Sequence, residues 1–572
     1  MPVRRRWARW FTLIASLGIA LPLLAMTAAS ASGAPKTGLP PGLQPTQVNI
    51  TNDSTHRYGE PEIAVNPKNP NNLVYFVMSN MLTYPCEASG DPNCQILPLS
   101  GTPAGEYNVP GWISTHVFVS FDAGRTWKQI TFPSIPAFNG EPGEATDHSD
   151  LISMGDPMVT VTANGTFYLG WDSMDLGIID LPPGYMFGGV TVCPTTTAPP
   201  GCPVGGLTDG GIAVSKSTNG GRTWSTPVLT GTGVDRPWMT TDLSTGTVYE
   251  ASSGFVDGSM STGNPSLPLS GNGIADRWVV SSADGVHWTT PEELGGCTTT
   301  PPTPATCYSG AGGANISAAH GVLAATFQAT TDAACMFFVA TAAPCTVFET
   351  STDSGQTWTR HAVAGLADAT GNILVAADPA IPGTFTVAAL NAAQTEFDVF
   401  VTDDSGVHWS GQPAVVTDNP ATEKYKAWID YSPQGVLGLA WRSVVAGADP
   451  PADPAATTLD DGMCDELGCI SGLPQDVNDE DPPVGPYTIW AALSNDAGST
   501  FSQPLQISTA PSPSYDPEMS AGTDDTSVIT LSGQDAFIGW GDWRPGDVAG
   551  FFSAVKLQAF TFPHEPHGHG NQ

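Results

Sequence analysis

The stretch Ser120-Phe121-Asp122-Ala123-Gly124-Arg125-Thr126-Trp127 is one of six variations on the pattern Ser-x-Asp-x-Gly-x-Thr-Trp in this chain of 572 residues. We call this eight-residue motif the box. The other copies are residues 217–224, with Asn219 in place of Asp; 281–288, with the Asp displaced to Asp284; 351–358; 402–409, with His408 in place of Thr; and 494–501, with Phe501 in place of Trp. Repeats spaced by tens of residues indicate a solenoid, a propeller or an array.

The chemistry of the box is that of a tight turn. Short Ser and Asp side chains hydrogen-bond backbone groups one or two residues further on. Glycine adopts a positive φ that other residues resist. The Trp supplies a large apolar body that can wedge beneath a hairpin. We therefore interpret the box aspartates as structural residues rather than as six catalytic acids.

The sequence around each box is typical of β-strands. Ahead of the first box, Glu62-Ile63-Ala64-Val65 is followed by Leu73-Val74-Tyr75-Phe76-Val77, and similar pairs of runs recur along the chain. Short runs rich in Val, Ile, Phe, Tyr and Trp between Asn, Pro and Gly turns predict strands. Each unit is two strands, a variable loop and a hairpin with the box at its tip, which makes a four-stranded blade. Blades arranged radially form an all-β propeller.

The last unit has no box and offers only three strands, which begin at Glu518-Met519-Ser520, Ala536 and Phe551. Residues 47–50, ahead of the first blade, provide a spare strand. Joining the two ends would close the ring and protect both edges. This count predicts a seven-bladed propeller, with a six-bladed sialidase-type propeller as the alternative.

The box resembles the Asp-box (BNR repeat) of sialidases and sialidase-like propellers, and the resemblance extends from about residue 60 to about residue 560. It implies the propeller fold. Asp-boxes also occur in propellers that are not sialidases, so the repeat alone does not imply an activity.

The N-terminus is typical of an exported protein. Residues 1–31 combine four arginines, an apolar run and a small-residue end at Ala29-Ser30-Ala31, which predicts a signal peptide. We expect a flexible segment over 32–46, the propeller over 47–562 and a disordered His-rich tail over 563–572. The predicted location is secreted and extracellular.

Ten cysteines fall into five close pairs: Cys86 with Cys94, Cys193 with Cys202, Cys297 with Cys307, Cys335 with Cys345, and Cys464 with Cys469. An even number of cysteines in an exported chain predicts disulfides. A zinc site is the rival interpretation, although none of the pairs has Cys-x-x-Cys spacing. All five pairs lie after a second strand or between blades, which places them on the face opposite the boxes. Long insertions at about 80–111, 174–209 and 446–486 fall on this same face, and we call it the mouth.

Charge restricts the partners. The chain has 19 basic and 55 acidic residues, a net charge of −36, and removing the leader makes it more negative because the leader holds four arginines and no acid. Nucleic acid and anionic membranes should be repelled. We expect a glycan or glycoprotein ligand, no membrane insertion after leader removal, and a monomer. No cofactor is required, but an acidic run within 460–481 could bind calcium through carboxylate oxygens.

Arginine is scarce, so its positions carry information. Arg57, Arg236, Arg442 and Arg544 all fall at first-strand entries or second-strand exits, on the mouth face. Planar guanidinium groups bind carboxylates in bidentate fashion. The alternative is an ion-pairing role at the rim, which suits Arg544 because Asp542 lies two residues away.

The resemblance to sialidases implies three arginines on the sugar carboxylate, a Tyr nucleophile assisted by a Glu, and an Asp acid. Tyr515 then becomes the expected nucleophile, with Tyr425 as a rival, Glu518 as its helper and Asp156 as the acid. Glu60, Glu62 and Asp235 are further acid or base candidates. The chain lacks the Arg-Ile-Pro motif of sialidases; its nearest text is Arg57-Tyr58-Gly59-Glu60-Pro61-Glu62. Three functions therefore stay open: a sialidase-like glycoside hydrolase, a non-catalytic glycan- or protein-binding propeller, and a different propeller enzyme.

Overall fold

The computed structural model of the chain describes residues 39–53, 56–81, 113–130, 151–175, 186–187, 190–191, 211–232, 235–254, 276–294, 310–329, 345–361, 363, 370–446, 486–513, 527–545 and 548–562. The chain from Thr37 onward forms one compact unit. Its described residues are almost entirely β, with 3₁₀ turns η1 (Pro41–Leu43) and η4 (Leu557–Ala559). No helix in this described part is long and apolar enough to cross a membrane.

Seven four-stranded antiparallel sheets make up the fold, and we number them as blades in chain order. Blade one contains β2 (His56–Val65), β3 (Leu73–Met81), β4 (Ile113–Ser120) and β5 (Lys128–Ile130). Blade two contains β6 (Leu151–Val161), β7 (Phe167–Asp175), β10 (Gly211–Ser217) and β11 (Val228–Leu229). Blade three contains β12 (Asp235–Thr241), β13 (Val248–Gly254), β14 (Asp276–Ser282) and β15 (Glu292–Glu293).

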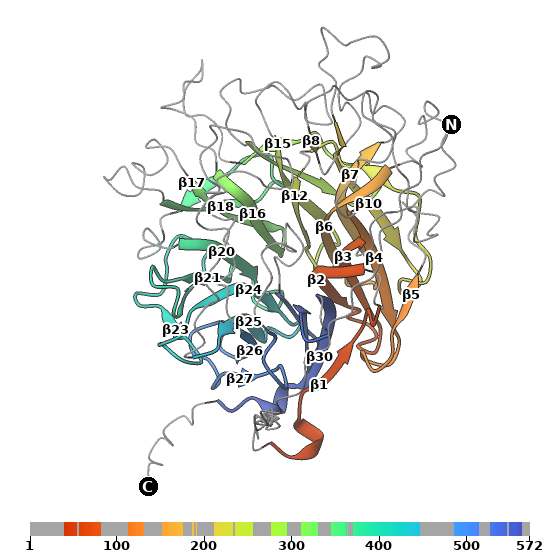
Figure 1. Ribbon diagram of the computed structural model, residues 1–572. Helices are drawn as coiled ribbons and strands as arrows, with labels where there is room; N and C mark the ends of the chain where they lie inside the picture. Colours follow the sequence, from red (N-terminus) through yellow and green to blue (C-terminus); the bar gives the residue numbers. More distant parts are fainter. Residues whose placement is uncertain are drawn as a thin grey trace, which may run out of the picture. The chain divides into compact units, whose positions relative to one another are not determined.

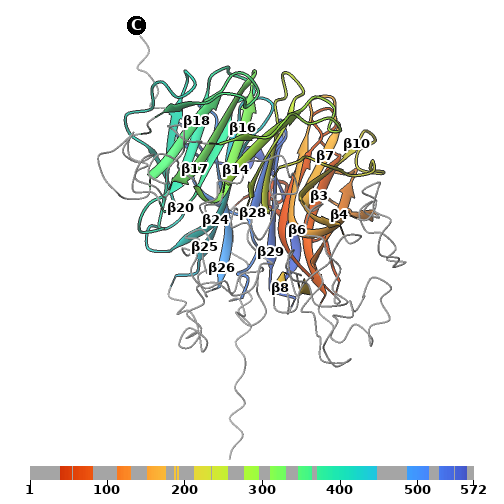
Figure 2. The same cartoon turned by 90° about the horizontal axis from the view of Figure 1, so that it is seen from above.

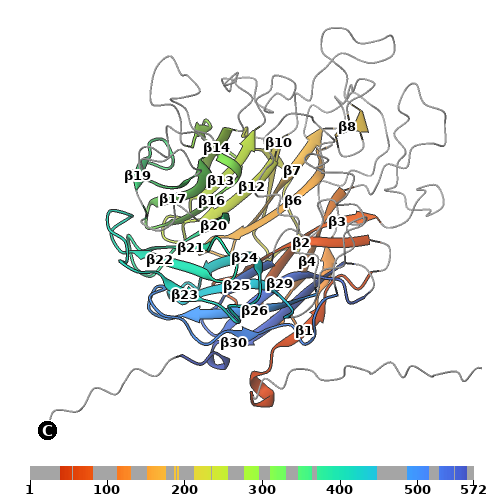
Figure 3. The ribbon, with the colours of Figure 1, turned by 60° about the vertical axis from the view of Figure 1, so that its left-hand side comes forward.

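The second half of the chain repeats this order (Figures 1 and 3). Blade four contains β16 (Gly310–Ala319), β17 (Val322–Ala329), β18 (Cys345–Ser351) and β19 (Thr359–His361). Blade five contains β20 (Thr370–Ala377), β21 (Phe385–Leu390), β22 (Phe397–Thr402) and β23 (Ala414–Val416). Blade six contains β24 (Lys424–Tyr431), β25 (Leu437–Val444), β26 (Tyr487–Ser494) and β27 (Leu505–Gln506). A small extra hairpin pairs β8 (Met186–Phe187) with β9 (Val190–Thr191).

Blade seven is assembled from both ends of the chain. It contains β28 (Ser527–Leu531), β29 (Asp535–Asp542), β30 (Ala549–Lys556) and, as its outer strand, β1 (Thr46–Asn49). β1 pairs antiparallel with β30, from Thr46 opposite Ala554 to Asn49 opposite Phe551, and red β1 lies beside blue β30 in Figure 1. The predicted closure of the ring and the count of seven blades are confirmed, and the six-bladed alternative is wrong.

The first strand of each blade lies innermost, and these strands form a closed ring. β2 contacts β6, and contacts continue in order through β12, β16, β20, β24 and β28, which returns to β2. Figure 2 shows the blades from the side, with β6, β24 and β28 near the middle of the view. Side chains of these seven strands therefore determine what occupies the central channel.

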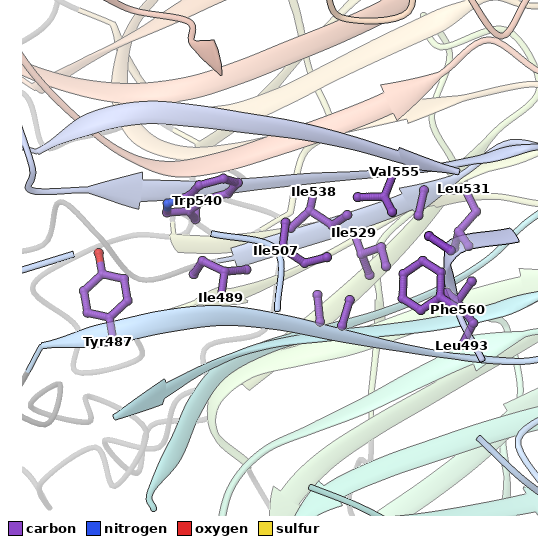
Figure 4. Close-up of a cluster of buried hydrophobic side chains, with 14 of the residues drawn as sticks. Tyr487, Ile489, Leu493, Ile507, Ile529, Leu531, Ile538, Trp540, Val555 and Phe560 are labelled. Carbon is purple, nitrogen blue, oxygen red and sulfur yellow. The ribbon is translucent and has the colours of Figure 1, made fainter. Parts of the chain in front are cut away.

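Both faces of most blades are buried, because each blade packs between two neighbours. All six residues of β21 are buried, as are seven of the eight in β25. Between blades six and seven, Ile489 and Leu493 of β26 face Ile529, Ile538 and other apolar side chains across the gap (Figure 4). This two-sided burial explains why the strands read as continuous apolar runs rather than as alternating patterns.

The boxes form tight turns held by their Ser and Asp side chains. In the copy at 351–358, Ser351 Oγ accepts a hydrogen bond from the Gly355 amide at 2.8 Å, and Asp353 accepts one from the Thr357 amide at 2.9 Å and one from its hydroxyl at 2.6 Å. These hydrogen bonds lower the pKa of Asp353 to about 2, and the bond from the Thr357 hydroxyl has the largest effect. The predicted turn chemistry is confirmed in the structure of the motif.

The box glycine is required because the preceding blade lies against it. A Cβ atom at Gly124, whose φ is 81°, would lie 2.1 Å from Cε1 of Phe552 in blade seven. At Gly285 the same atom would lie 2.1 Å from Cε1 of Tyr168, in blade two. Any side chain here would have to displace an aromatic ring and adopt a strained backbone as well. Each box therefore locks its own blade onto the one before it.

Two local predictions need correction. In the third box the Ser that caps the glycine is Ser282, whose Oγ accepts from the Gly285 amide at 2.8 Å, rather than Ser281. Asp284 is thus in register with its Ser, and the copy is shortened between Asp and Gly. In blade seven the first strand is Ser527–Leu531 rather than the run at Glu518, which lies outside the described residues.

Replacing Ser351 by Ala should cost more stability than replacing Asp353 by Ala. Ser351 is 2 % exposed, so its loss leaves the Gly355 amide buried without an acceptor, at a cost of about 2 kcal/mol. Asp353 is exposed, and water can replace its bonds, so we expect a loss of about 1 kcal/mol. Chemical denaturation measures both. Equal stability of the two variants and the wild type would contradict a structural role for the box.

Candidate functional site at the mouth of the channel

The mouth lies where first strands begin and second strands end. The chain leaves blade one at Met81 and returns at Ile113, and it leaves blade six at Val444 and returns at Tyr487. The strand ends that flank the predicted insertions at 80–111, 174–209 and 446–486 therefore lie on the face opposite the boxes, as predicted. The cysteines fall outside the described residues, except for the backbone of Cys345 at the start of β18.

A bulge opens most of the innermost strands just inside this mouth. The register shifts between Gly59 and Glu62 in β2, and between Gly155 and Met158 in β6. The same shift occurs between Asp235 and Trp238 in β12 and between Tyr425 and Trp428 in β24. Bulges re-aim side chains next to functional sites.

The bulges place charged residues in the left-handed backbone region. Glu60 has a φ of 50°, Asp156 of 47° and Lys426 of 45°. In the first two cases a proline follows, and proline has no amide hydrogen to give to a ladder. A sequence pattern marks these bulges: a charged residue precedes a proline in Glu60-Pro61, Asp156-Pro157 and Arg236-Pro237. The pattern was not among the predicted features.

Two tryptophans meet across the centre of the ring. Trp238 of blade three and Trp428 of blade six stack with ring centroids 4.5 Å apart and planes 20° from parallel. Each follows its bulge directly, and each packs against buried clusters of several blades. Because blades three and six lie on different sides of the ring, this pair spans the channel at the level just below the bulges.

Two acidic residues with raised pKa values lie on the same inner strands. Glu62 of β2 is 2 % exposed, and burial, followed by the charge of Asp430, raises its pKa well above its usual range. Burial raises the pKa of Asp430 on β24 to about 7, although Thr530 Oγ1 and the Tyr431 amide donate to it at 2.9 and 2.8 Å. Glu62 was predicted as an acid or base candidate, whereas Asp430 was not predicted.

Arg442 lies between blades six and seven. Its guanidinium is 1 % exposed, and Nε donates to Ser527 Oγ at 2.8 Å. Its charge lies over the rings of Tyr487 and Tyr425, at 4.9 and 5.9 Å from the ring centroids. Such cation–π contacts stabilise a buried guanidinium.

Arg544 is paired with Asp542. Nε and one terminal nitrogen donate to the two carboxylate oxygens at 2.8 and 2.6 Å, which is the ion pair foreseen as the alternative role. Its other terminal nitrogen approaches Thr509 and Gln47, the latter on the outer strand β1. Arg442 and Arg544 share none of these contact residues.

For the remaining predicted residues, the structure describes either the backbone position or nothing. Arg57 lies on β2 and Arg236 on β12, each near the mouth end of an innermost strand, but their side chains are outside the described part. Asp156 is partly exposed on its bulge. Tyr515 and Glu518 lie outside the described residues, so the predicted nucleophile and its helper stay predictions.

Comparisons with known proteins give only distant likenesses. Neither the scan against protein-family models nor the search of curated proteins finds a match. Among solved structures, the chain is similar to a Hadza microbial sialidase (17 % identity, covering 85 % of this chain and 77 % of that one, TM-score 0.39). It is also similar to a protein of unknown function from Dyadobacter fermentans (14 %, 70 % and 94 %, TM-score 0.37) and to a Penicillium chrysogenum α-L-arabinanase complexed with arabinobiose (13 %, 69 % and 93 %, TM-score 0.35). The propeller assignment accordingly rests on the sheet topology itself.

The raised pKa of Asp430 predicts that the free energy of unfolding falls as the pH rises from about 4 to about 7. In that range an unfolded Asp, with a pKa of about 3.9, is ionised, whereas folded Asp430, with a pKa of about 7, still holds its proton. The folded state binds more protons, so raising the pH favours unfolding. In protein treated with a chelator to remove metal ions, Asp430→Asn should reduce this fall in unfolding free energy by on the order of 2 kcal/mol.

Denaturation curves at several pH values test this expectation. Asp353→Asn is the control, because the pKa of Asp353 is about 2 and its titration lies below the range. A pH profile of Asp430→Asn that matches the wild type would show that Asp430 does not titrate as expected.

Proposed function

We propose that this chain is an exported propeller that binds carbohydrate at the mouth of its channel. The predicted signal peptide, the predicted disulfides and the strong negative charge support export. The rigid scaffold of seven blades, with long insertions attached to one face, supports recognition at that face, because binding residues concentrate on loops held by such scaffolds.

The observation that carries the proposal is the stacked pair of Trp238 and Trp428. Since their rings stack across the centre, a ligand that enters from the mouth meets an aromatic surface. Sugar rings present apolar C–H faces together with hydroxyl groups, and sites that combine aromatic walls with a few polar groups suit such ligands. Asp156 and Lys426, both partly exposed on their bulges, supply polar groups at the rim.

The described arginines favour binding over sialidase chemistry. A carboxylate clamp needs guanidinium donors directed at the ligand. Two donors of Arg544 are used on Asp542, and Arg442 is almost completely buried. A clamp built on these two residues would have to break the ion pair of Arg544 with Asp542 and the contact of Arg442 with Ser527 between blades six and seven.

Glycan binding is tested with the purified mature protein on an array of neutral and acidic glycans, followed by calorimetry on the strongest ligand. Lys426→Gln should weaken binding about 5–20-fold, because a charge-assisted hydrogen bond contributes about 1–2 kcal/mol. Lys128→Gln, on the exposed outer strand of blade one, is the matched control and should bind like the wild type. Equal affinity of both variants, or no glycan ligand at all, would refute the proposed site.

Hydrolysis of sialosides is the second candidate, and the place of Asp156 favours it. The residue expected to protonate the leaving group is partly exposed at the mouth. The assay is release of the fluorophore from a fluorogenic sialoside across a range of pH values. If the chain is a sialidase, Asp156→Asn should lower kcat about 10²–10⁴-fold, as for loss of a general acid, and Tyr515→Phe should abolish turnover. No release by the wild type would exclude hydrolysis of these sialosides.

A further inference from the structure

The carboxyl group of Glu62 has no partner in the described part of the protein. It is 2 % exposed, its Oε1 is fully enclosed, and no described residue donates a hydrogen bond to it. An ionised carboxylate in such a place is costly unless something compensates its charge. Among the described residues, the charged group that acts on Glu62 is a second acid.

That second acid is Asp430, which comes from another blade. Its charge reaches Glu62, because it contributes to the raised pKa of that residue. Thr530 of β28 donates to Asp430, and β28 contacts both β24 and β2. Blades six, seven and one thus bring two carboxyl groups and a hydroxyl together where the ring closes. Neither acid forms an ion pair with a described Lys or Arg.

The same level of the channel holds another unsatisfied oxygen. Asn315 occupies on β16 the position after the bulge that Glu62 occupies on β2. It is 3 % exposed, and its Oδ1 is enclosed without a hydrogen-bond partner. Asp430 is partly exposed on the inner strand. The uncompensated groups are all hard oxygen donors.

We propose that the channel beside the tryptophan pair binds a divalent cation through the carboxylates of Glu62 and Asp430. Calcium takes oxygen ligands from carboxylates, carbonyls and water in flexible geometry. Zinc is disfavoured because Cys and His are its usual ligands, and the described partners of the pair include neither. The net charge of −36 raises the local concentration of cations. This site is separate from the predicted acidic run at 460–481.

A cation at this place would tie together the three blades around the closure of the ring. It would compensate both carboxylates at once, so the folded protein alone would bind it, and binding to the folded state stabilises it by mass action. The competing possibility is that the two carboxyl groups keep a shared proton and bind no metal. The two cases differ in how stability responds to added calcium.

The test uses the mature protein, treated with chelator, exchanged into calcium-free buffer at pH 8 and then titrated with CaCl₂ or MgCl₂. Thermal unfolding and calorimetry are the readouts. Wild-type Tm should rise by about 2–4 °C at millimolar Ca²⁺, and Glu62→Gln and Asp430→Asn should lose most of this rise. Without calcium at pH 8, both variants should be at least as stable as the wild type, because each removes a carboxyl group whose ionisation at this place is costly.

Glu250→Gln is the matched control. Glu250 is also fully buried, and burial raises its pKa to about 7, but Thr232 donates to it at 2.7 Å and it lies in blade three. This variant should keep the full calcium response. Two results would overturn the proposal: a wild type whose Tm does not change with either cation, or a calcium response that persists in Glu62→Gln, which would place the ion at the acidic run.

Discussion

The contact between each box glycine and the preceding blade is the constraint on which the ring depends. A hydrogen atom at Gly124 leaves room for Phe552, and the same relation recurs between Gly285 and Tyr168 and between Gly406 and Phe348. The Ser and Asp side chains hold the turn in the one conformation that allows this approach. Blade seven has no box; instead Phe560, at the end of the last 3₁₀ turn, packs in the cluster shared with blade six. The repeated motif therefore controls how blades meet rather than what they bind.

The functional geometry follows from a second repeated device at the opposite end of the inner strands. The bulges place charged residues in the left-handed backbone region and shift the register of the residues that follow them. Where the residue after the bulge is Trp238 or Trp428, two rings stack across the centre, and where it is Glu62, a carboxyl group is buried. The box end of each blade holds the ring together. The bulge end, at the mouth, carries residues that vary from blade to blade.

Much of the fold could be predicted from local sequence, because strands, turns and boxes are determined by neighbouring residues. The pairing of Asp542 with Arg544 was foreseen for the same reason. The first strand of blade seven was placed too early, because Glu518-Met519-Ser520 copies the start of other first strands and Ser527–Leu531 is equally apolar. The tryptophan stack and the approach of Asp430 to Glu62 join residues of distant blades. No local pattern encodes such meetings, since they depend on the number of blades and on where each bulge lies.

The pairing of β1 with β30 also constrains the order in which the molecule can be built. The first strand of the propeller to leave the ribosome finds its partner only after residues 549–556 have been made. Blades one to six can form from contiguous chain, but Phe552 cannot settle against Gly124 until the last strands arrive. Contacts between residues this far apart in sequence form slowly. Until they form, the unpaired strand edges promote aggregation. A chain with this topology therefore cannot close its ring until its synthesis is almost complete, and the edge of β30 and the strand β1 must stay unpaired until then.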